Sequence, residues 1–469
     1  WMKMEQERGI SITSSVLQFE YRGKKLNLLD TPGHADFSED TYRVLAAVDC
    51  AVMLIDNAKG VEDRTRKLFE VCRMRGIPVL TLVNKCDRDG IEPLQLLDDV
   101  GQALGIQCAP INWPVGSGRD FVGVVERASG EVLLFSNSGG HDVVPFERIK
   151  LSEAGERIRE PVYNQAVEDL ELLEGAGEPF DQEKFLSGKQ TPVFFGSAMN
   201  NFGIEPFMQA MVDLAPGPRT RPCAGKQRKP DDADFTGFIF KIQANMNPKH
   251  RDRVAFMRVQ SGRFTRGMDV HIFRSGEAIR LAKPHTFLGQ ERQLVEDAWP
   301  GDIVGLYDPG ALRIGDSLYV GDPVNYQGIP RFAPEFFSRV RLKDPLRRKH
   351  LAQGLAQLSQ EGAIQIFYRP ELGEQDPFLG AVGMLQFEVM MQRLELEYNV
   401  HAVLESVPFR IARWITGDPK GLAWMKARRD YTVVEDRHGQ PVALAESTWP
   451  LQYAARENPG LEFHDVEPL

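Results

Sequence analysis

The sequence Asp30-Thr31-Pro32-Gly33-His34 decides the fold, because it joins the apolar run Leu26-Asn27-Leu28-Leu29 to a segment with helical character. An aspartate at the carboxyl end of a strand can hold a magnesium ion through water, and a glycine lets a backbone N–H approach a terminal phosphate. His34 then stands where an attacking water would lie, and orienting that water is a sufficient catalytic part in phosphoryl transfer. A strand-to-helix turn with a surface histidine is the alternative for these five residues taken alone.

A second polar loop, Asn84-Lys85-Cys86-Asp87, follows the apolar run of residues 78–83, which is typical of a buried parallel strand. The Asp87 carboxylate can accept two hydrogen bonds from guanine, Asn84 can meet N7 and O6, and the Lys85 stem can cover the ring. Adenine would leave Asp87 unpaired, so discrimination on the order of 10⁴-fold is expected. A solvated loop is the alternative for this stretch alone. The two loops in this order, each at the end of a strand, favour a guanine nucleotide site.

These loops resemble those of the translational GTPases, and most closely those of the peptide chain release factor 3 family. Upstream, Gln6-Glu7-Arg8-Gly9-Ile10-Ser11-Ile12 resembles the first switch of that superfamily, and a disordered charged terminus is the alternative for it. Downstream, Gly196-Ser197-Ala198 resembles the last guanine-contacting loop.

The resemblance implies an enzyme that hydrolyses GTP to GDP with Mg²⁺ as cofactor. His34 would orient the attacking water, Ser11 and Asp30 would serve the magnesium ion, and Ser197 with Ala198 would close over the base. The nucleotide-binding residues implied in this way are Asp30, Thr31, Pro32, Gly33, His34, Asn84, Lys85, Cys86, Asp87, Ser197 and Ala198.

One expected part is absent from the 469 residues: they contain no GxxxxGK[ST] phosphate loop, which cradles the β- and γ-phosphates in P-loop NTPases. The chain opens on Trp1, inside the stretch that resembles the first switch. We therefore expect an amino-terminally truncated sequence whose first βαβ unit is missing, and a natural loss of nucleotide binding is the alternative. As written, the chain is expected to bind nucleotide very weakly and to be inactive.

Composition narrows the class of protein. The net charge of −10 argues against non-specific coating of nucleic acid, and no apolar run approaches the ~20 residues of a membrane span. The five cysteines are odd in number and lack CxxC spacing, which is typical of reduced thiols. We expect a cytoplasmic protein that binds neither membrane nor DNA.

Three domains are expected from the patterns along the chain. Residues 1–222 alternate strand and helix, which is typical of an α/β G domain with a parallel sheet, and residues 112–149 resemble an insertion of the family. After a linker rich in proline and charge, residues 235–326 carry short runs broken by glycine turns, as in an all-β barrel. Residues 327–469 contain amphipathic helices before apolar strands, which predicts an α+β domain with split β-α-β units. After His34, Asp36 and Glu39 are expected to form a capping box.

The resemblance implies the ribosome and class I peptide chain release factors as partners. Such a protein uses GTP-linked switching to drive the class I factor off the ribosome; elongation factor G, with two further domains, is the nearest competitor. A ribosome-binding module without nucleotide is the alternative function.

Two basic stretches either contact ribosomal RNA or form solvated faces. They are the string of residues 243–253 and the cluster Arg339, Arg341, Lys343, Arg347, Arg348 and Lys349.

Overall fold

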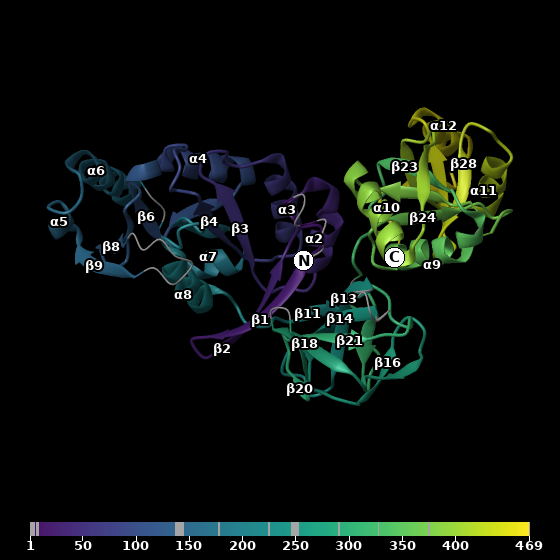
Figure 1. Cartoon of the computed structure of the whole chain (residues 1–469), viewed down its shortest axis with the longest axis horizontal. Coiled ribbons are helices and arrows are strands. Elements are labelled where there is room, and N and C mark those ends of the chain that lie inside the picture. Colours follow the sequence, from purple (N-terminus) through teal and green to yellow (C-terminus); the bar gives the residue numbers. More distant parts are fainter. Residues whose placement is uncertain are drawn as a thin grey trace. The chain divides into compact units, whose positions relative to one another are not determined.

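The computed structural model describes residue 5 and residues 9–136, 145–176, 179–223, 226–244, 253–288, 291–326, 328–373 and 376–468 (Figure 1). The chain divides into two compact units. The first contains residues 1–19, 27–47 and 220–469, and the second contains residues 20–26 and 48–219. The division into domains at 1–222, 235–326 and 327–469 stays a prediction.

The second unit contains a four-stranded parallel sheet in the order β3-β4-β10-β5. Its strands are β3 (Ala51–Asp56), β4 (Val79–Asn84), β10 (Gln190–Phe195) and β5 (Gln107–Pro110), and its helices are α3 (Asp63–Met74), α4 (Pro93–Leu104), α7 (Gln182–Leu186) and α8 (Ile204–Leu214). Leu82 of β4 and Phe194 of β10 pack with Phe185 and Phe207 of two helices. Because β4 and β10 are parallel neighbours, the loops that follow them leave the sheet at the same edge.

A second, antiparallel sheet of the same unit has the order β6-β7-β8-β9 and accounts for the break in the pattern at residues 112–149. Its elements are β6 (Asn112–Val115), η2 (Gly118–Asp120), β7 (Gly123–Glu126), β8 (Glu131–Phe135) and β9 (Phe146–Lys150), followed by α5 (Leu151–Ala154) and α6 (Glu160–Ala176). The buried Trp113 donates to Asp169 of α6 at 3.1 Å. The indole N–H is thereby satisfied inside the core.

The run before His34 forms strand β2 (Lys24–Asp30), which makes a two-stranded sheet with β1 (Ser15–Tyr21). The expectation that this run already belongs to the parallel sheet is wrong for the residues that the structure describes. The physical reason is local: Arg22 and Gly23, both with positive φ, form a two-residue turn that folds β2 back onto β1. In this pairing Leu28 is 42% exposed. Short helices η1 (Ala35–Phe37) and α2 (Ser38–Leu45) follow.

The all-β part of the first unit has one sheet of eight strands in the order β17-β16-β22-β13-β14-β21-β18-β19, and two small sheets, β15-β20 and β11-β12. The strands are β11 (Arg221–Cys223), β12 (Lys226–Arg228), β13 (Thr236–Ala244), β14 (Arg253–Ser261), β15 (Phe264–Thr265), β16 (Asp269–Ile272), β17 (Ala278–Arg280), β18 (Pro284–Leu288), β19 (Glu291–Leu294), β20 (Asp297–Ala298), β21 (Ile303–Tyr307) and β22 (Ser317–Tyr319). Ile239, Met257 and Leu318 lie in its core and are fully buried. The predicted all-β barrel domain is confirmed.

The α+β part has an eight-stranded antiparallel sheet in the order β26-β23-β25-β24-β28-β29-β27-β30. Its elements are β23 (Phe336–Leu342), η3 (Pro345–Arg347), α9 (Arg348–Gln360), β24 (Gln365–Tyr368), β25 (Phe378–Ala381), α10 (Met384–Tyr398), β26 (Ala402–Ser406), β27 (Ile411–Gly417), α11 (Pro419–Lys426), β28 (Thr432–Asp436), β29 (Pro441–Ala445), α12 (Trp449–Glu457) and β30 (Leu461–His464). Two β-α-β-β-α-β units therefore follow each other in the chain, as the split pattern predicted.

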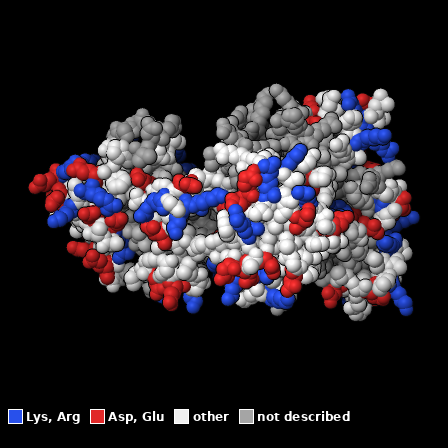
Figure 2. Space-filling model, turned by 90° about the horizontal axis from the view of Figure 1, so that it is seen from below, with Lys and Arg blue, Asp and Glu red and all other residues white. Residues whose placement is uncertain are grey.

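The surface and the thiols complete the description. Acidic and basic side chains are interspersed on the face drawn in Figure 2. Among the described residues, no helix has the length and apolar character needed to cross a bilayer. All five cysteines are free, and burial raises the pKa of four thiols to about 12: Cys50, Cys72, Cys86 and Cys108.

Candidate functional site

The loops after β4 and β10 are joined by hydrogen bonds at the edge of the parallel sheet. The backbone N–H of Cys86 donates to the carbonyl oxygen of Gly196 at 3.1 Å. The side-chain Oδ1 of Asn84 accepts from the backbone N–H of Ala198 at 2.9 Å and from that of Lys85 at 2.8 Å. We expected Asn84 to contact the base. In the structure its carbonyl oxygen is used to hold the two loops together, which leaves the amide group to meet a ligand.

Lys85 lies along this edge with its charge already paired. Its backbone is left-handed (φ +68°), a conformation that few residues other than glycine adopt, and the bond from its N–H to Asn84 stabilises it. Its Nζ lies 2.7 Å from Oδ2 of Asp56, at the end of the neighbouring strand β3. Burial alone would raise the pKa of Asp56, but the hydrogen bond and charge of Lys85 together with the backbone N–H groups of Ala58 and Lys59 outweigh burial and lower it. Sequence reasoning missed Asp56, although its register opposite Asn84 in β3 and β4 follows from the two strand ends.

Asp87 retains an unused hydrogen-bond acceptor. Its Oδ1 is buried and accepts no hydrogen bond from the described residues. A buried carboxylate oxygen without a donor is costly, so such an atom calls for a ligand or solvent donor. The two adjacent donors of guanine, N1–H and the exocyclic amine, are of the kind that this carboxylate can accept.

Ser197 and Ala198 shape the loop after β10. Ser197 is fully buried, and its backbone N–H donates to the carbonyl oxygen of Phe202 at 2.9 Å. Its hydroxyl accepts from the N–H of Asn200 at 3.4 Å, so the side chain serves the turn. Ala198 is exposed, and its N–H is the one bound by Asn84.

Asp30, Gly33 and His34 lie in the first unit. Asp30 ends β2, and burial together with the nearby charge of Glu5 raises the pKa of its carboxyl group. A Cβ at Gly33 would meet no atom within 4 Å, so the backbone there is open to a ligand. Pro32 is buried, and Thr31 is half-buried. The side chain of His34 is 43% exposed, and its Nδ1 accepts from the backbone N–H of Asp36 at 3.3 Å.

The stretch that resembles a first switch is described only from Gly9 onward, apart from Glu5. Gln6, Glu7 and Arg8 lie outside the described residues. Ser11 is exposed, whereas Ile12 is buried and donates its N–H to Oε1 of Glu5 at 2.9 Å. The Glu5 carboxylate therefore lies beside the residues that follow the exposed Ser11, and its charge acts on the carboxyl group of Asp30. That concentration of oxygen ligands and negative charge fits a hard cation such as Mg²⁺. Sequence reasoning missed Glu5.

The capping box expected at Asp36 and Glu39 is wrong. Helix α2 has Phe37 as its N-cap, without a side-chain bond. The Asp36 carboxylate instead accepts the backbone N–H of Leu385 at 2.8 Å, and Glu39 pairs with Arg43 at 3.0 Å. A contact with the α+β part has taken the Asp36 carboxylate, and an i,i+4 pair within α2 has taken Glu39.

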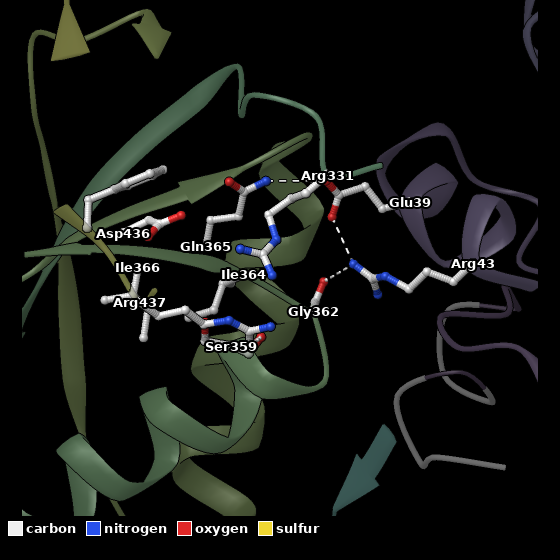
Figure 3. A pocket seen from close by; sticks show the side chains of 11 residues that line it. Glu39, Arg43, Arg331, Ser359, Gly362, Ile364, Gln365, Ile366, Asp436 and Arg437 are labelled. Carbon is white, nitrogen blue, oxygen red and sulfur yellow. Dashed lines mark hydrogen bonds and ion pairs between the residues drawn. The ribbon is translucent and has the colours of Figure 1, made fainter. Parts of the chain in front are cut away.

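Buried charges meet where α2 faces β24 (Figure 3). Arg43 bonds to Oε2 of Glu39 and to the carbonyl oxygens of Glu361 and Gly362 at 3.0–3.1 Å. Nε2 of Gln365 donates to Oε1 of Glu39 at 3.2 Å. The cavity between them has a volume of about 10 Å³, which is room for about one water molecule. This site has the size of a structural contact and is too small for a nucleotide.

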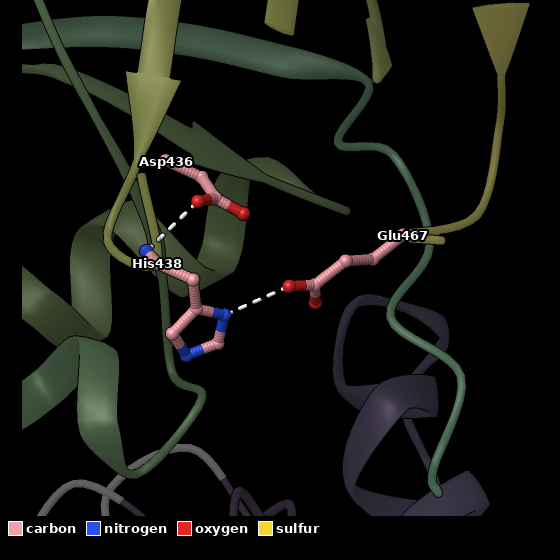
Figure 4. Close-up of side chains that lie close together, drawn as sticks. All are labelled: Asp436, His438 and Glu467. Atoms are coloured by element: carbon pink, nitrogen blue, oxygen red, sulfur yellow. Dashed lines mark hydrogen bonds and ion pairs between the residues drawn. The ribbon is translucent and has the colours of Figure 1, made fainter. Parts of the chain in front are cut away.

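Asp436, His438 and Glu467 bring ligand-type atoms within 4.8 Å of one another (Figure 4). Asp436 already accepts the indole N–H of Trp414 at 3.2 Å and the backbone N–H of His438 at 2.8 Å. Burial alone would raise the pKa of Glu467, but the hydrogen bond with His438 and the charge of Arg331 lower it. These partners satisfy the three side chains without a metal.

Comparison with known proteins places these loops in a family. The model of the elongation factor Tu GTP binding domain matches residues 1–217, that of elongation factor G domain 2 matches residues 234–321, and that of the class II release factor RF3 C-terminal domain matches residues 326–455. A crystal structure of a protein from Thermus thermophilus superimposes with a TM-score of 0.69 at 21% identity, covering 89% of this chain and 64% of that one. That likeness supports the fold.

Two relatives are similar over nearly the whole chain. Peptide chain release factor 3 of Symbiobacterium thermophilum is 49% identical over 99% of this chain and 88% of its own length. Peptide chain release factor 3 of Gloeobacter violaceus is 49% identical over 100% of this chain and 89% of its own length. The chain therefore belongs to the peptide chain release factor 3 family, and is a translational GTPase of termination.

Proposed function

We propose that this protein uses GTP to remove and recycle class I release factors from the ribosome, in the cytoplasm, and that it hydrolyses GTP in doing so. The observation that carries the nucleotide part is the joined pair of loops. Asn84 holds Ala198, while Asp87 keeps a buried oxygen without a donor among the described residues. A solvated loop would have no use for this arrangement. Family membership favours the GTPase over a ribosome-binding module that lacks nucleotide.

In the proposed site, Asp87 reads guanine and Lys85 covers the ring with its aliphatic stem. The ion pair with Asp56 removes the ammonium group from the base and fixes the direction of the stem. Cys86 contributes its backbone to the loop, and Ser197 keeps the turn that presents Ala198.

Asp30 and Ser11 are the proposed magnesium ligands, directly or through water, and Glu5 adds negative charge near Asp30. A bound Mg²⁺ would neutralise charge on the phosphates. Thr31, Pro32 and Gly33 form the proposed backbone approach to the terminal phosphate, since nothing described fills the space beside Gly33.

His34 is the proposed water-orienting residue. With its Nδ1 occupied by the N–H of Asp36, a neutral ring carries its proton on Nε2, the nitrogen that remains available to a ligand. The proposed chemistry needs only positioning of the water and the phosphates.

The proposed ribosome contacts involve the basic cluster at the start of the α+β part. Arg339 and Arg341 pair with Asp376 and Glu405, whereas the remaining members are exposed or half-buried and form no ion pair with the described residues. The remaining members are Lys343, Arg347, Arg348 and Lys349. In the other basic string, residues 245–252 lie outside the described residues.

The test is GTP hydrolysis, with and without ribosomes, by this chain joined to a phosphate loop. His34→Ala is expected to lower the ribosome-stimulated rate by on the order of 10²-fold or more while guanine nucleotide binding persists. His401→Ala, at an exposed histidine whose Nδ1 lies 3.5 Å from Glu395, is the matched control and should hydrolyse as wild type. An unchanged stimulated rate in His34→Ala would refute the assigned role. Ribosome binding without any stimulated hydrolysis in the wild type would refute the GTPase proposal for this chain.

A further inference from the structure

A single residue, Asp36, connects the candidate catalytic histidine with the α+β part. Oδ1 of Asp36 lies 3.4 Å from Nδ1 of His34, and the backbone N–H of Asp36 donates to the same nitrogen at 3.3 Å. Oδ2 of Asp36 accepts the N–H of Leu385 at 2.8 Å. Leu385 is 349 residues further along the chain, in the first turn of α10. The side chain of Asp36 is 19% exposed.

Helix α10 lacks a side chain of its own at the position where this carboxylate binds. Its N-cap is Gly383, and an N-cap side chain normally accepts the N–H of the second or third helical residue. Leu385 is the second helical residue, so Asp36 supplies the missing cap from another part of the chain. The positive end of the helix dipole also favours a carboxylate there.

Gly383 makes room for this contact. A Cβ at Gly383 would lie 1.9 Å from Cγ of Asp36, closer than any real contact. The backbone of Gly383 is extended (φ −147°, ψ 158°), which any residue adopts, so its own conformation does not require glycine. The three nearest atoms that a Cβ would meet all belong to the Asp36 carboxylate, so this contact leaves no room for a side chain at position 383.

Two further contacts hold the same segment against the α+β part. Phe37 packs with Ile12 and with Val389 of α10, and its ring centroid lies 6.1 Å from that of His34. On the next turn, Arg43 of α2 bonds to the carbonyl oxygen of Gly362 at 3.0 Å (Figure 3). The position of Asp36 is therefore determined from both sides.

We propose that Asp36 is a positioning residue: its backbone N–H holds Nδ1 of His34 while its carboxylate caps α10, so that the orientation of His34 depends on the position of α10. This inference rests on the proposed role of His34. Movement of α10 away from Asp36 would release the carboxylate, and the backbone N–H that holds Nδ1 of His34 would lose its fixed position.

The first measurement follows the imidazole without reference to activity. The nine histidines are labelled with ¹⁵N, and the signals of His34 are identified by their loss in His34→Ala. At pH 8 the wild type should show one tautomer, protonated on Nε2. Asp36→Ala and Gly383→Ala should each shift the signals toward a mixture of tautomers, and hydrogen exchange of the first turn of α10 should become faster. Unchanged signals in both variants would overturn the proposal.

The second measurement separates positioning from nucleotide binding. In ribosome-stimulated hydrolysis, Asp36→Ala and Gly383→Ala should lower kcat by on the order of 10- to 100-fold with little change in KM for GTP. Asp36→Asn retains an oxygen for the cap and offers an N–H to Nδ1, so it should restore most of the rate. Gly217→Ala is the control, since a Cβ there meets no atom within 4 Å.

The outcomes distinguish the two proposals. If His34→Ala abolishes stimulated hydrolysis while Asp36→Ala and Gly383→Ala hydrolyse as wild type, the positioning role is wrong and the function of His34 stands. If His34→Ala is fully active while the imidazole signals respond to both variants, the contact is real and the catalytic assignment of His34 is wrong.

Discussion

Replacing Arg43 by methionine tests the buried charges between α2 and β24. Methionine keeps much of the length and apolar surface of the stem but removes the guanidinium group. That group bonds to Oε2 of Glu39 and to two carbonyl oxygens at 3.0–3.1 Å, and its side chain is 10% exposed. In the variant, the Glu39 carboxylate would keep the 3.2 Å bond from Gln365 as its remaining hydrogen bond with the described side chains. The variant therefore leaves a buried carboxylate without its hydrogen-bonded counter-charge, and the charge of Arg331 is the one that still acts on it.

The expected cost follows from that unpaired charge. Removing one partner of a buried ion pair costs about 3–5 kcal/mol. Native-state hydrogen exchange of the α2 amides measures this locally, without assuming that a chain with several domains unfolds in one step. If the amides exchange through opening of this contact, their exchange should be faster by on the order of 10²- to 10³-fold at neutral pH.

The same variant has a predictable pH dependence. Burial is the largest influence on Glu39 and raises its pKa above the ordinary glutamate value, although Arg43 lowers it. Losing Arg43 raises this pKa further. Between the ordinary value and the folded value, the folded protein binds a proton that the unfolded chain does not, so stability rises as the pH falls through this window. The penalty of Arg43→Met should therefore be full above the folded pKa and shrink as the pH is lowered.

A double variant is the control for this reasoning. Glu39→Gln combined with Arg43→Met removes both charges, so it should cost less than Arg43→Met alone, with an interaction of about 1–3 kcal/mol. A cost below about 0.5 kcal/mol for Arg43→Met at neutral pH would refute the assignment of a buried, paired charge. A penalty that does not shrink at lower pH would refute the role of Glu39.

Three further predictions follow from the candidate site and the thiols. Asp87→Asn should weaken GTP binding by on the order of 10²- to 10⁴-fold and improve binding of xanthosine triphosphate, because the 2-carbonyl of xanthine accepts from the new amide. Titration with fluorescent nucleotides measures both affinities, and an unchanged affinity for GTP would contradict guanine reading by Asp87. The 469-residue sequence by itself should bind GTP very weakly because it contains no phosphate loop, and tight binding in the same titration would show that another segment replaces that loop. Burial raises the pKa of four thiols to about 12: Cys50, Cys72, Cys86 and Cys108. At pH 8 these thiols should react with iodoacetamide at least about 100-fold more slowly than a free cysteine until the protein is unfolded, and mass spectrometry measures the reaction.

The proposed base-reading loop illustrates what local sequence can predict. An apolar run followed by Asn84-Lys85-Cys86-Asp87 predicted both a buried strand and the exit of the loop at its end, and the structure has β4 ending at Asn84. The partner of Lys85 was not predictable in the same way. Asp56 lies 29 residues away, and only the pairing of β3 with β4 brings its carboxylate within 2.7 Å of the ammonium group.

The segment after His34 shows where sequence reasoning failed and why. Asp36 and Glu39 have the spacing of a capping box, and local spacing is all that a sequence offers for such a prediction. The partner of Asp36, the N–H of Leu385, was chosen by tertiary packing, whereas Glu39 pairs with Arg43 one turn further along the same helix. The Asp36 carboxylate accepts from the N-terminus of α10, whose own N-cap is a glycine, in place of a local backbone N–H.

The sequence by itself determined the order of the fold classes, the two polar loops with their residue types, and the split pattern of the α+β part. These features depend on periodicity, turn residues and neighbours within a few positions, which a chain carries locally. The tertiary structure alone decided that Asn84 holds Ala198 and that Asp36 joins His34 to α10. Such pairs join residues separated by up to 349 positions, and their partners are selected by burial, shape and hydrogen-bond demand once the elements pack.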